Sequence, residues 1–310
     1  MSDPVVIKWM LDTRALWPNA SATKDLESEV KPRPCLCVMI YPGTPNQWLI
    51  TQVQASRALA LLTDQERASV LRYHFVRDAK MALGSALLKR HVISSLCNIH
   101  WSLAQFTRDA HTKPVFRLAD DSEPLLFNVS HQAGLVALFA VHRPTPGLSI
   151  GVDVACPSER RTRDHEYINK DGWPRYVDMH ESVLSPSEVR RLKQLPFHDM
   201  DRKLAYFYAL WCFREAYVKM TGEALMAKWL AQLEFRYFAP PGETPPEGGD
   251  LEIWFQGEQL KDVDVRMEWF SNDYIVCTAV KAASENMRTE GPWILLDVDQ
   301  VLESAETSNA

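Results

Sequence analysis

Apolar residues recur along this chain with two periods, and the period separates the predicted helices from the predicted strands. Residues 79–97 carry apolar side chains at near-helical spacing, with mostly basic side chains between them. Residues 200–222 show the strongest helical pattern, and Gly222 is suited to end that helix. Two more helices are expected to start at capping boxes, in which a hydroxyl residue precedes a glutamate by three positions: Thr63 with Glu66, and Ser185 with Glu188.

Short apolar runs predict the strands. The predicted strands are residues 34–41, 125–131, 135–141, 149–155, 251–256, 266–270 and 274–280. Within residues 149–155, β-branched apolar side chains occupy every second position, so the opposite face of this strand carries Asp153. Gly134 lies between two of the runs and predicts a turn that joins them.

Polar segments between these elements are predicted to lack regular structure. We expect residues 157–180 to form a surface loop or insertion, residues 239–250 a proline-rich loop, and residues 303–310 a disordered tail. Helices and strands mix without regular alternation, which favours an α+β fold over a doubly wound parallel sheet. Each half holds a long helix and several strands, so we expect two α+β subdomains, residues 1–145 and 146–302.

The composition restricts the class of partner. The 310 residues carry a net charge of -6, which gives no general attraction to nucleic acid, so any basic surface must be local and suits a small anionic ligand. No apolar run reaches the roughly 18 residues of a membrane span, and the N-terminus lacks a signal-peptide pattern. We therefore expect a cytoplasmic protein. The six cysteines have no metal-ligand or CxxC spacing and are predicted to be small core residues: Cys35, Cys37, Cys97, Cys156, Cys212 and Cys277.

Two acidic residues are candidates for chemistry. Asp153 lies in an apolar strand, where an unpaired carboxylate is costly to bury. It could therefore bind a cation, or it could point to solvent or pair with an arginine. Glu215 shares one face of its helix with Trp211 and Lys219. That face suits a cation with a phosphate, although an ordinary surface Glu–Lys pair has the same spacing.

Ser130 and His131 follow a predicted strand. Neighbouring strand side chains point to opposite faces, so this dipeptide alone cannot form a nucleophile–base pair. A phosphate contact and a core hydrogen bond both fit the position. The chain has no GxSxG elbow, P-loop or GxGxxG motif.

Three motifs occur in order along the chain. They are Asn128-Val129-Ser130-His131, Gly151-Val152-Asp153-Val154-Ala155, and Trp211 to Lys219 with Arg214, Glu215 and Ala216 between. Together they resemble the motifs of the 4'-phosphopantetheinyl transferase superfamily, of the surfactin-synthetase-activating type, over roughly residues 35–280. Residues 72–90 and 111–116 also fit that family, and the two polar insertions look most like those of its fungal members.

This resemblance implies a fold, an activity and a partner. The fold would be a pseudo-dimer of two similar α+β subdomains with the coenzyme A site in the cleft between them. The activity would be transfer of phosphopantetheine from coenzyme A to a serine of an acyl or peptidyl carrier protein, with release of 3',5'-ADP. Such carriers belong to fatty acid, polyketide and nonribosomal peptide synthases and to aminoadipate reductase, which implies roles in secondary metabolism and lysine biosynthesis. A monomer is expected, with a carrier-docking surface on the 200–230 region.

The resemblance also implies roles for individual residues. Asp153 and Glu215 would hold Mg²⁺, with a water completing the site because Ala155 stands where bacterial members often have glutamate. Glu215 is the expected general base, either directly or through a metal-bound water, and Lys219 would assist it or contact the pyrophosphate. The catalytic set is therefore Asp153, Glu215 and Lys219. The residues expected to contact coenzyme A are Arg72, Arg77, Lys113, Ser130, His131, Arg214 and Lys219.

Two other function classes are compatible with parts of the pattern. Another coenzyme A-dependent transferase, such as an acyltransferase, would need no Mg²⁺, so sensitivity to EDTA separates it from the first reading. A non-catalytic carrier-binding module would have no need for Glu215, so the complete third motif argues against it.

Overall fold

A computed structural model describes residues 3–18, 20–27, 55–110, 113–223, 227, 229–282 and 289–309. The predicted strand at 34–41, with Cys35 and Cys37, lies outside these residues, as do His111 and Thr112 of the 111–116 segment.

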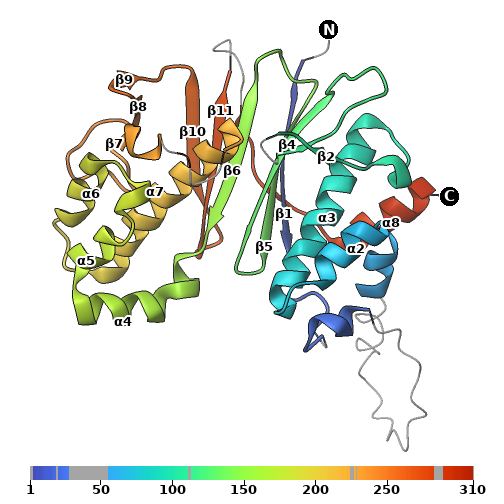
Figure 1. Cartoon of the computed structure of the whole chain (residues 1–310), viewed down its shortest axis with the longest axis horizontal. Coiled ribbons are helices and arrows are strands. Elements are labelled where there is room, and N and C mark those ends of the chain that lie inside the picture. Colours follow the sequence, from blue (N-terminus) through green and yellow to red (C-terminus); the bar gives the residue numbers. More distant parts are fainter. Residues whose placement is uncertain are drawn as a thin grey trace, which may run out of the picture. The chain divides into compact units, whose positions relative to one another are not determined.

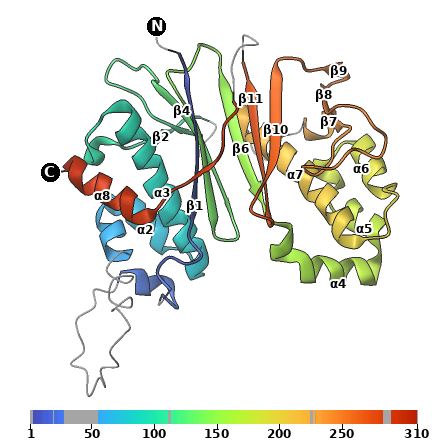
Figure 2. The same ribbon diagram turned by 180° about the vertical axis from the view of Figure 1, so that it is seen from behind.

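Packing divides the chain into two compact units, and each is assembled from separate chain segments (Figures 1 and 2). The first unit consists of residues 1–8, 107–132 and 139–292, and the second of residues 9–106, 133–138 and 293–310. The predicted subdomains, residues 1–145 and 146–302, are two continuous stretches of chain, whereas these units are not. The predicted division stays a prediction.

An antiparallel sheet and a long helix form the core of the first unit. The sheet has the order β10 (Val263–Phe270), β11 (Tyr274–Lys281), β6 (Ser149–Ala155). The register pairs Cys277 with Asp153. Helix α7 (Met200–Thr221) packs on β6 and β11, and its buried side chains supply much of the hydrophobic core.

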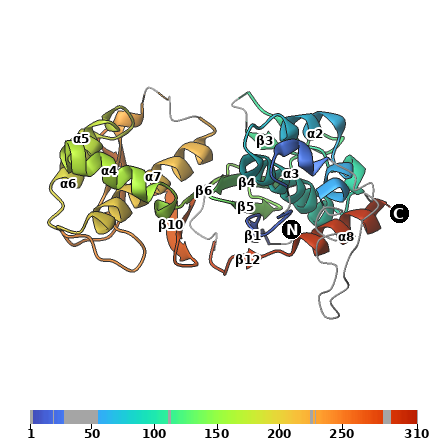
Figure 3. The same ribbon diagram turned by 90° about the horizontal axis from the view of Figure 1, so that it is seen from below.

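Shorter elements complete the first unit, and Figure 3 shows α4, α5 and α6 gathered beside α7. The helices are η3 (Pro157–Arg160), α4 (Arg161–Asp171), α5 (Trp173–Asp178), η4 (Glu181–Val183), α6 (Pro186–Lys193) and η5 (Leu230–Gln232). The strands are β2 (Thr107–Arg108), β3 (Pro114–Val115), β4 (Leu125–Gln132), β7 (Leu233–Arg236), β8 (Glu252–Phe255) and β9 (Glu258–Gln259).

The second unit is mostly helical. Its helices are η1 (Thr23–Leu26), α2 (Asp64–Leu71), α3 (Val76–Cys97), η2 (Trp101–Leu103) and α8 (Val298–Asn309). The strands with residues in this unit are β1 (Val5–Asp12), β5 (Leu135–His142) and β12 (Ile294–Leu295). They belong to a sheet of order β12-β1-β5-β4, in which β12 pairs with β1 in parallel.

The strongest sequence signals are confirmed. Both predicted capping boxes are present, at the starts of α2 and α6. Gly222 ends α7 with a φ of +82°, a backbone conformation that glycine adopts without strain. The predicted strands within the described residues are all found, and residues 239–250 contain no helix or strand. The chain is of the α+β class, as predicted.

Two predictions of irregular structure were wrong. Residues 157–180 form η3, α4 and α5, because several of their few apolar side chains, including Ile168 and Tyr176, are buried in the core. Residues 303–309 complete α8, because Val301, Leu302 and Ala305 bury one side of that helix. A narrow apolar stripe was therefore sufficient to form a helix in both places.

Two expectations about composition can be compared with the described residues. Cys156, Cys212 and Cys277 are buried, as predicted for small core residues, whereas Cys97 is only partly buried. None of the helices described has the length and apolar character that crossing a membrane requires.

Candidate active site

The approach of β6 to α7 depends on Gly151. A Cβ atom at this position would lie 2.1 Å from the backbone oxygen of Ala216 and 2.5 Å from the backbone nitrogen of Met220, distances that no side chain tolerates. Asp153 is two residues further along the strand and so lies on the same face, towards α7. The glycine of the second motif therefore brings the aspartate close to the residues of the third.

Asp153, Lys219 and Ser130 form one hydrogen-bonded cluster. The ammonium nitrogen Nζ of Lys219 lies 2.6 Å from Oδ1 of Asp153, and Oγ of Ser130 donates to the same oxygen at 2.8 Å. Nζ of Lys219 also lies 2.9 Å from Oγ of Ser130. Burial disfavours the charge on Lys219, but attraction to Asp153 and Glu215 outweighs it, so the pKa of Lys219 is raised and its ammonium group stays charged.

Glu215 is the carboxylate in this cluster that lacks a cationic partner of its own. It lies one helical turn before Lys219 on α7 and is partly buried. No hydrogen bond or ion pair joins its carboxylate to any residue that the structure describes. Burial, together with the negative charge of Asp153, raises its pKa to about 7, and Lys219 offsets this only in part. Negative charge is therefore under-compensated at this position.

The two carboxylates fit the donor set of a magnesium ion. Oδ1 of Asp153 accepts from Ser130 and from Lys219, and the buried thiol of Cys212 is a further side-chain hydrogen-bond partner of this carboxylate. Mg²⁺ is commonly held by one or two carboxylates together with substrate phosphates and water. Among the described residues no group of three or more His, Cys, Asp and Glu side chains is placed to hold a metal, and Ala155 supplies no oxygen. Asp153 and Glu215 are the two oxygen donors that could hold the ion.

Side chains of β4 hold the edge of β6. Three side chains at alternate positions of β4 accept hydrogen bonds from backbone N–H groups of β6. Asn128 Oδ1 accepts from Val152 at 3.1 Å, Ser130 Oγ from Val154 at 3.3 Å, and Gln132 Oε1 from Cys156 at 3.2 Å. We call these residues the β4 side-chain ladder. It occupies the edge of β6 opposite β11, which is the only strand paired with β6 in the described sheet.

The other residues predicted to contact coenzyme A are distributed between the units. Lys113 lies in the first unit, where its Nζ donates to the backbone oxygen of Ile150 at 3.2 Å and burial lowers its pKa against the opposing effect of nearby acidic groups. His131 is exposed and follows Ser130 on β4. Arg72 and Arg77 are exposed in the second unit. The predicted contacts of these four residues with coenzyme A stay predictions.

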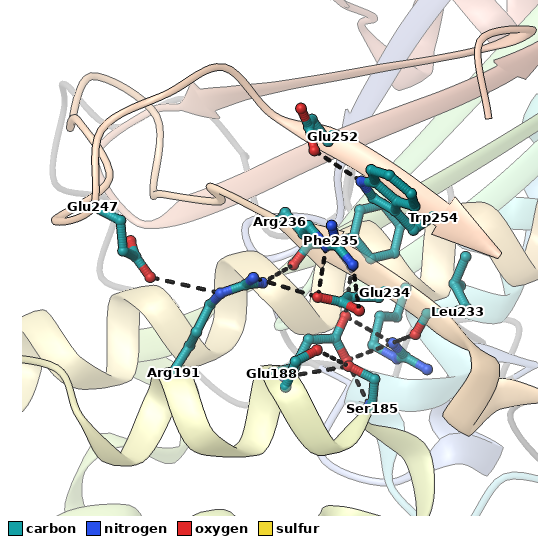
Figure 4. A network of polar contacts seen from close by, with 12 residues as sticks. Ser185, Glu188, Arg191, Leu233, Glu234, Phe235, Arg236, Glu247, Glu252 and Trp254 are labelled. Carbon is teal, nitrogen blue, oxygen red and sulfur yellow. Dashed lines mark hydrogen bonds and ion pairs between the residues drawn. The ribbon is translucent and has the colours of Figure 1, made fainter. Parts of the chain in front are cut away.

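Arg214 does not have the role predicted for it. Only 1% of this residue is exposed, and its guanidinium group donates to both carboxylate oxygens of Glu188 and to two backbone oxygens, those of Leu230 and Leu233. Figure 4 shows Glu188 inside this network, beside Ser185 and Phe235. Arg214 is thus a buried structural residue that joins α7 to α6 and β7, and it is withdrawn from the coenzyme A contacts.

A cavity that sequence reasoning missed lies on the same helix. It has a volume of about 450 Å³, and aromatic side chains form much of its wall, including Tyr176, Phe207 and Trp211. Trp211 is one helical turn before Glu215, so the cavity adjoins the carboxylate along α7. Cations that also line the cavity are Arg160, Arg163 and Lys170. The aromatic residues within 157–180 were the available signal, but the polar composition of that segment concealed them.

These features define a class of site: two carboxylates and a lysine that interact electrostatically, which is a set of groups that suits a divalent cation with a phosphate ester. Residues 46–143 match the family model described as 4'-phosphopantetheinyl transferase, N-terminal, and residues 149–279 match that of the 4'-phosphopantetheinyl transferase superfamily. The chain therefore belongs to the 4'-phosphopantetheinyl transferase superfamily, as its three motifs predicted.

Individual relatives agree with this membership. The chain is 46% identical to "4'-phosphopantetheinyl transferase 1" of Fusarium mangiferae, over 99% of this chain and 98% of that protein. It is 33% identical to "4'-phosphopantetheinyl transferase A" of Aspergillus fumigatus, over 73% of this chain and 78% of that protein. A human relative, "L-aminoadipate-semialdehyde dehydrogenase-phosphopantetheinyl transferase", is 27% identical over 79% of this chain and 75% of its own length. The predicted similarity to fungal members is confirmed.

Proposed function

We propose that this chain transfers the 4'-phosphopantetheine arm of coenzyme A to a serine of an apo carrier-protein domain, with Asp153 and Glu215 as the ligands of Mg²⁺. The observation that carries the proposal is the under-compensated carboxylate of Glu215 beside Asp153 and Lys219. A scaffold protein would gain nothing from a buried acidic group without a partner, because such a group is destabilising.

The ion and the lysine have distinct roles in this proposal. When bound, Mg²⁺ supplies positive charge that compensates the pyrophosphate of coenzyme A. Lys219 is held as an ammonium group by Asp153, so it acts as a phosphate contact and not as the base. Since phosphoryl transfer is accelerated mainly by positioning and electrostatics, a fixed charge of this kind contributes directly.

The reaction balances with one proton acceptor. The carrier serine oxygen forms a bond to the phosphorus next to pantetheine, and the bond from that phosphorus to the oxygen of 3',5'-ADP breaks. The serine proton must be accepted nearby, and Glu215 is the group we propose for this step, because its carboxylate has no hydrogen-bond donor or ion-pair partner among the described residues.

The cavity next to Trp211 suits the remainder of the substrate. Pantetheine is neutral and partly apolar, so an aromatic wall beside Glu215 is a suitable place for it. The cations around the cavity would then face the carrier domain. On this basis Trp211→Ala should raise KM for coenzyme A, whereas Arg163→Glu should raise KM for the carrier and leave KM for coenzyme A unchanged.

One experiment tests the function. The chain is incubated with coenzyme A, Mg²⁺ and a recombinant apo acyl carrier protein, and the carrier is weighed by mass spectrometry. We expect a mass gain of one phosphopantetheine arm that EDTA prevents. No gain with any of several fungal apo carrier domains would refute the proposal, and a gain that persists in EDTA would refute the role of the ion.

The choice of carrier is a separate proposal. The human relative is named for L-aminoadipate-semialdehyde dehydrogenase, so the carrier domain of an aminoadipate reductase is the one we would try first. Carrier domains of fatty acid, polyketide and nonribosomal peptide synthases, which the sequence resemblance implies, would follow. The monomeric state and the cytoplasmic location expected from the sequence also stay predictions.

A further inference from the structure

The aromatic cavity beside Trp211 contains a histidine whose tautomer is fixed by the backbone. His180 lines this cavity, and its Nδ1 lies 2.9 Å from the backbone oxygen of Tyr176. A carbonyl oxygen can only accept a hydrogen bond, so Nδ1 carries the hydrogen. Burial is the largest influence on the pKa of His180 and lowers it, which keeps the ring neutral at neutral pH. The second ring nitrogen, Nε2, is therefore left with a lone pair and acts as an acceptor.

This acceptor has no partner in the described part of the chain. The bond to Tyr176 is the one hydrogen bond that His180 makes with the residues described. Nε2 is also open to solvent, because the side-chain atoms there that are both enclosed and unpaired belong to Trp17, His91 and Arg214. The half-buried histidine thus offers a free lone pair to whatever enters the cavity.

Three aromatic rings hold the imidazole of His180 in place. Its ring centre lies 4.6 Å from that of Phe207, 5.2 Å from that of Tyr176 and 5.9 Å from that of Trp211. Contacts with these rings restrict the torsion of the histidine side chain, and the bond at Nδ1 opposes a flip of the ring. Nε2 therefore keeps a constant direction, which is a property of groups that recognise a ligand.

Other acceptors in the cavity wall already receive donors. Oδ2 of Asp164 accepts from the hydroxyl group of Tyr208 at 2.5 Å, and Oε1 of Gln132 accepts from the backbone nitrogen of Cys156 at 3.2 Å. The lone pair of His180 is left for a ligand. Pantetheine contains amide N–H groups, and an amide N–H that is enclosed by aromatic side chains without an acceptor is costly.

We propose that His180 is a substrate contact, whose Nε2 accepts a hydrogen bond from an amide N–H of the pantetheine arm. This inference rests on the proposed function, which places the arm in this cavity. The contact makes the chain prefer coenzyme A over nucleotides that lack the arm. It lies away from the reacting phosphorus, so it contributes to affinity and not to the chemical step.

The test compares the binding of coenzyme A with that of 3',5'-ADP, which has no pantetheine arm. Isothermal titration calorimetry measures both on the full-length chain with Mg²⁺. His180→Phe keeps an aromatic ring and removes both nitrogens. We expect it to raise the Kd for coenzyme A about tenfold and to leave the Kd for 3',5'-ADP within about twofold of the wild-type value. The kcat for transfer should also stay within about twofold, as expected for a contact made equally before and during reaction.

Two further variants separate the two ring nitrogens. The side-chain amide of His180→Gln reaches the position of Nε2, whereas that of His180→Asn reaches only the position of Nδ1. We expect His180→Gln to recover most of the affinity for coenzyme A and His180→Asn to bind it as weakly as His180→Phe does. If His180→Gln is as weak as His180→Phe, or if His180→Asn is the variant that recovers, the bond to Tyr176 explains the loss and the proposal is wrong.

The remaining outcomes are equally decisive. Equal weakening of coenzyme A and 3',5'-ADP in His180→Phe would mean a general disturbance of the site and would overturn the proposal. Unchanged affinity for coenzyme A would overturn it as well, and a raised KM for the carrier in the same variant would then assign the cavity to the carrier. If His180→Phe does not fold, the comparison of His180→Gln with His180→Asn decides alone. The binding measurements need no carrier, so failure of the wild-type chain to modify any carrier refutes the proposed function separately.

Discussion

Nζ of Lys219 lies 2.6 Å from Oδ1 of Asp153, although 66 positions separate the two residues in the chain. The contact joins the second and third sequence motifs and keeps the lysine charged. It also leaves Glu215, one turn away on α7, without a cation of its own. This imbalance of charge is the basis of the predictions that follow.

The charge of Lys219 should be needed for transfer. Lys219→Met has a similar length but no charge, and we expect it to lower kcat by about 100-fold or more, because one fixed charge at a reacting phosphate is typically worth this much. Lys219→Arg keeps the charge with a different shape and should retain intermediate activity. Rates are measured from the mass of the carrier. Wild-type activity in Lys219→Met would remove the lysine from the mechanism.

Glu215 should make the metal-free chain less stable at higher pH. Its pKa is about 7 in the folded chain against an ordinary value of 4.5, so the folded state holds this proton more tightly than the unfolded state does. The stabilisation from this proton is complete below about pH 4.5 and is lost as pH rises through about 7, by roughly 3 kcal/mol in total. In Glu215→Gln the side chain at position 215 does not ionise, so this position contributes no pH dependence to stability.

The measurement is urea unfolding in EDTA at several pH values. Between pH 5 and pH 8 the wild-type chain should lose stability relative to Glu215→Gln, and the variant should be the more stable of the two at pH 8. If the free energy of unfolding changes with pH in the same way for the two proteins, Glu215 titrates normally and the cluster is not short of positive charge.

Gly151→Ala should be strongly destabilising. The added Cβ would meet backbone atoms of α7, which cannot move aside as a side chain can. We expect a loss of about 3 kcal/mol or more, at the upper end of the range for overpacked cores. Ser149→Ala, on the same strand, should change stability little. If Gly151→Ala unfolds at the wild-type urea concentration, the close packing of β6 on α7 is not as described.

The buried pair of Arg214 and Glu188 should matter for folding and not for substrate affinity. Glu188→Gln leaves Arg214 with an uncompensated buried charge, and breaking such a pair from one side typically costs 3–5 kcal/mol, roughly. Arg214→Met together with Glu188→Leu should recover much of this loss, because an apolar pair of similar volume needs no compensation. Thermal unfolding and KM for coenzyme A are measured on the wild type, on Glu188→Gln, on the double variant and on Arg214→Met alone. A selective rise in KM for Arg214→Met, with unchanged stability, would restore Arg214 to the substrate contacts.

Local signals predicted the local structure well. The capping boxes at Thr63 and Ser185 and the glycine that ends α7 each depend on a few neighbouring residues, so they could be read directly from the sequence. Helix α4 was missed because its average composition is strongly polar and it buries little more than Ile168 and Asp164. Helix α8 was missed because its apolar residues are few, and only packing reveals that they share one face.

The candidate site was predicted in identity but not in arrangement. Asp153, Glu215 and Lys219 could be identified from the motifs, because the family pattern has these residue types at the matching positions. No local sequence pattern indicated that Arg214 pairs with Glu188, 26 positions earlier, or that the hydroxyl group of Ser130 donates to Asp153. Both contacts join residues far apart in the chain, and a pattern along the chain does not encode such contacts.

The claim on which the account depends most is that Asp153 and Glu215 hold one divalent ion together. Mn²⁺ binding by the metal-free chain, followed by electron paramagnetic resonance, tests it without substrate or carrier. The account predicts one ion per wild-type chain, and loss of that binding in both Asp153→Asn and Glu215→Gln. Undiminished binding of the ion by either variant would contradict it.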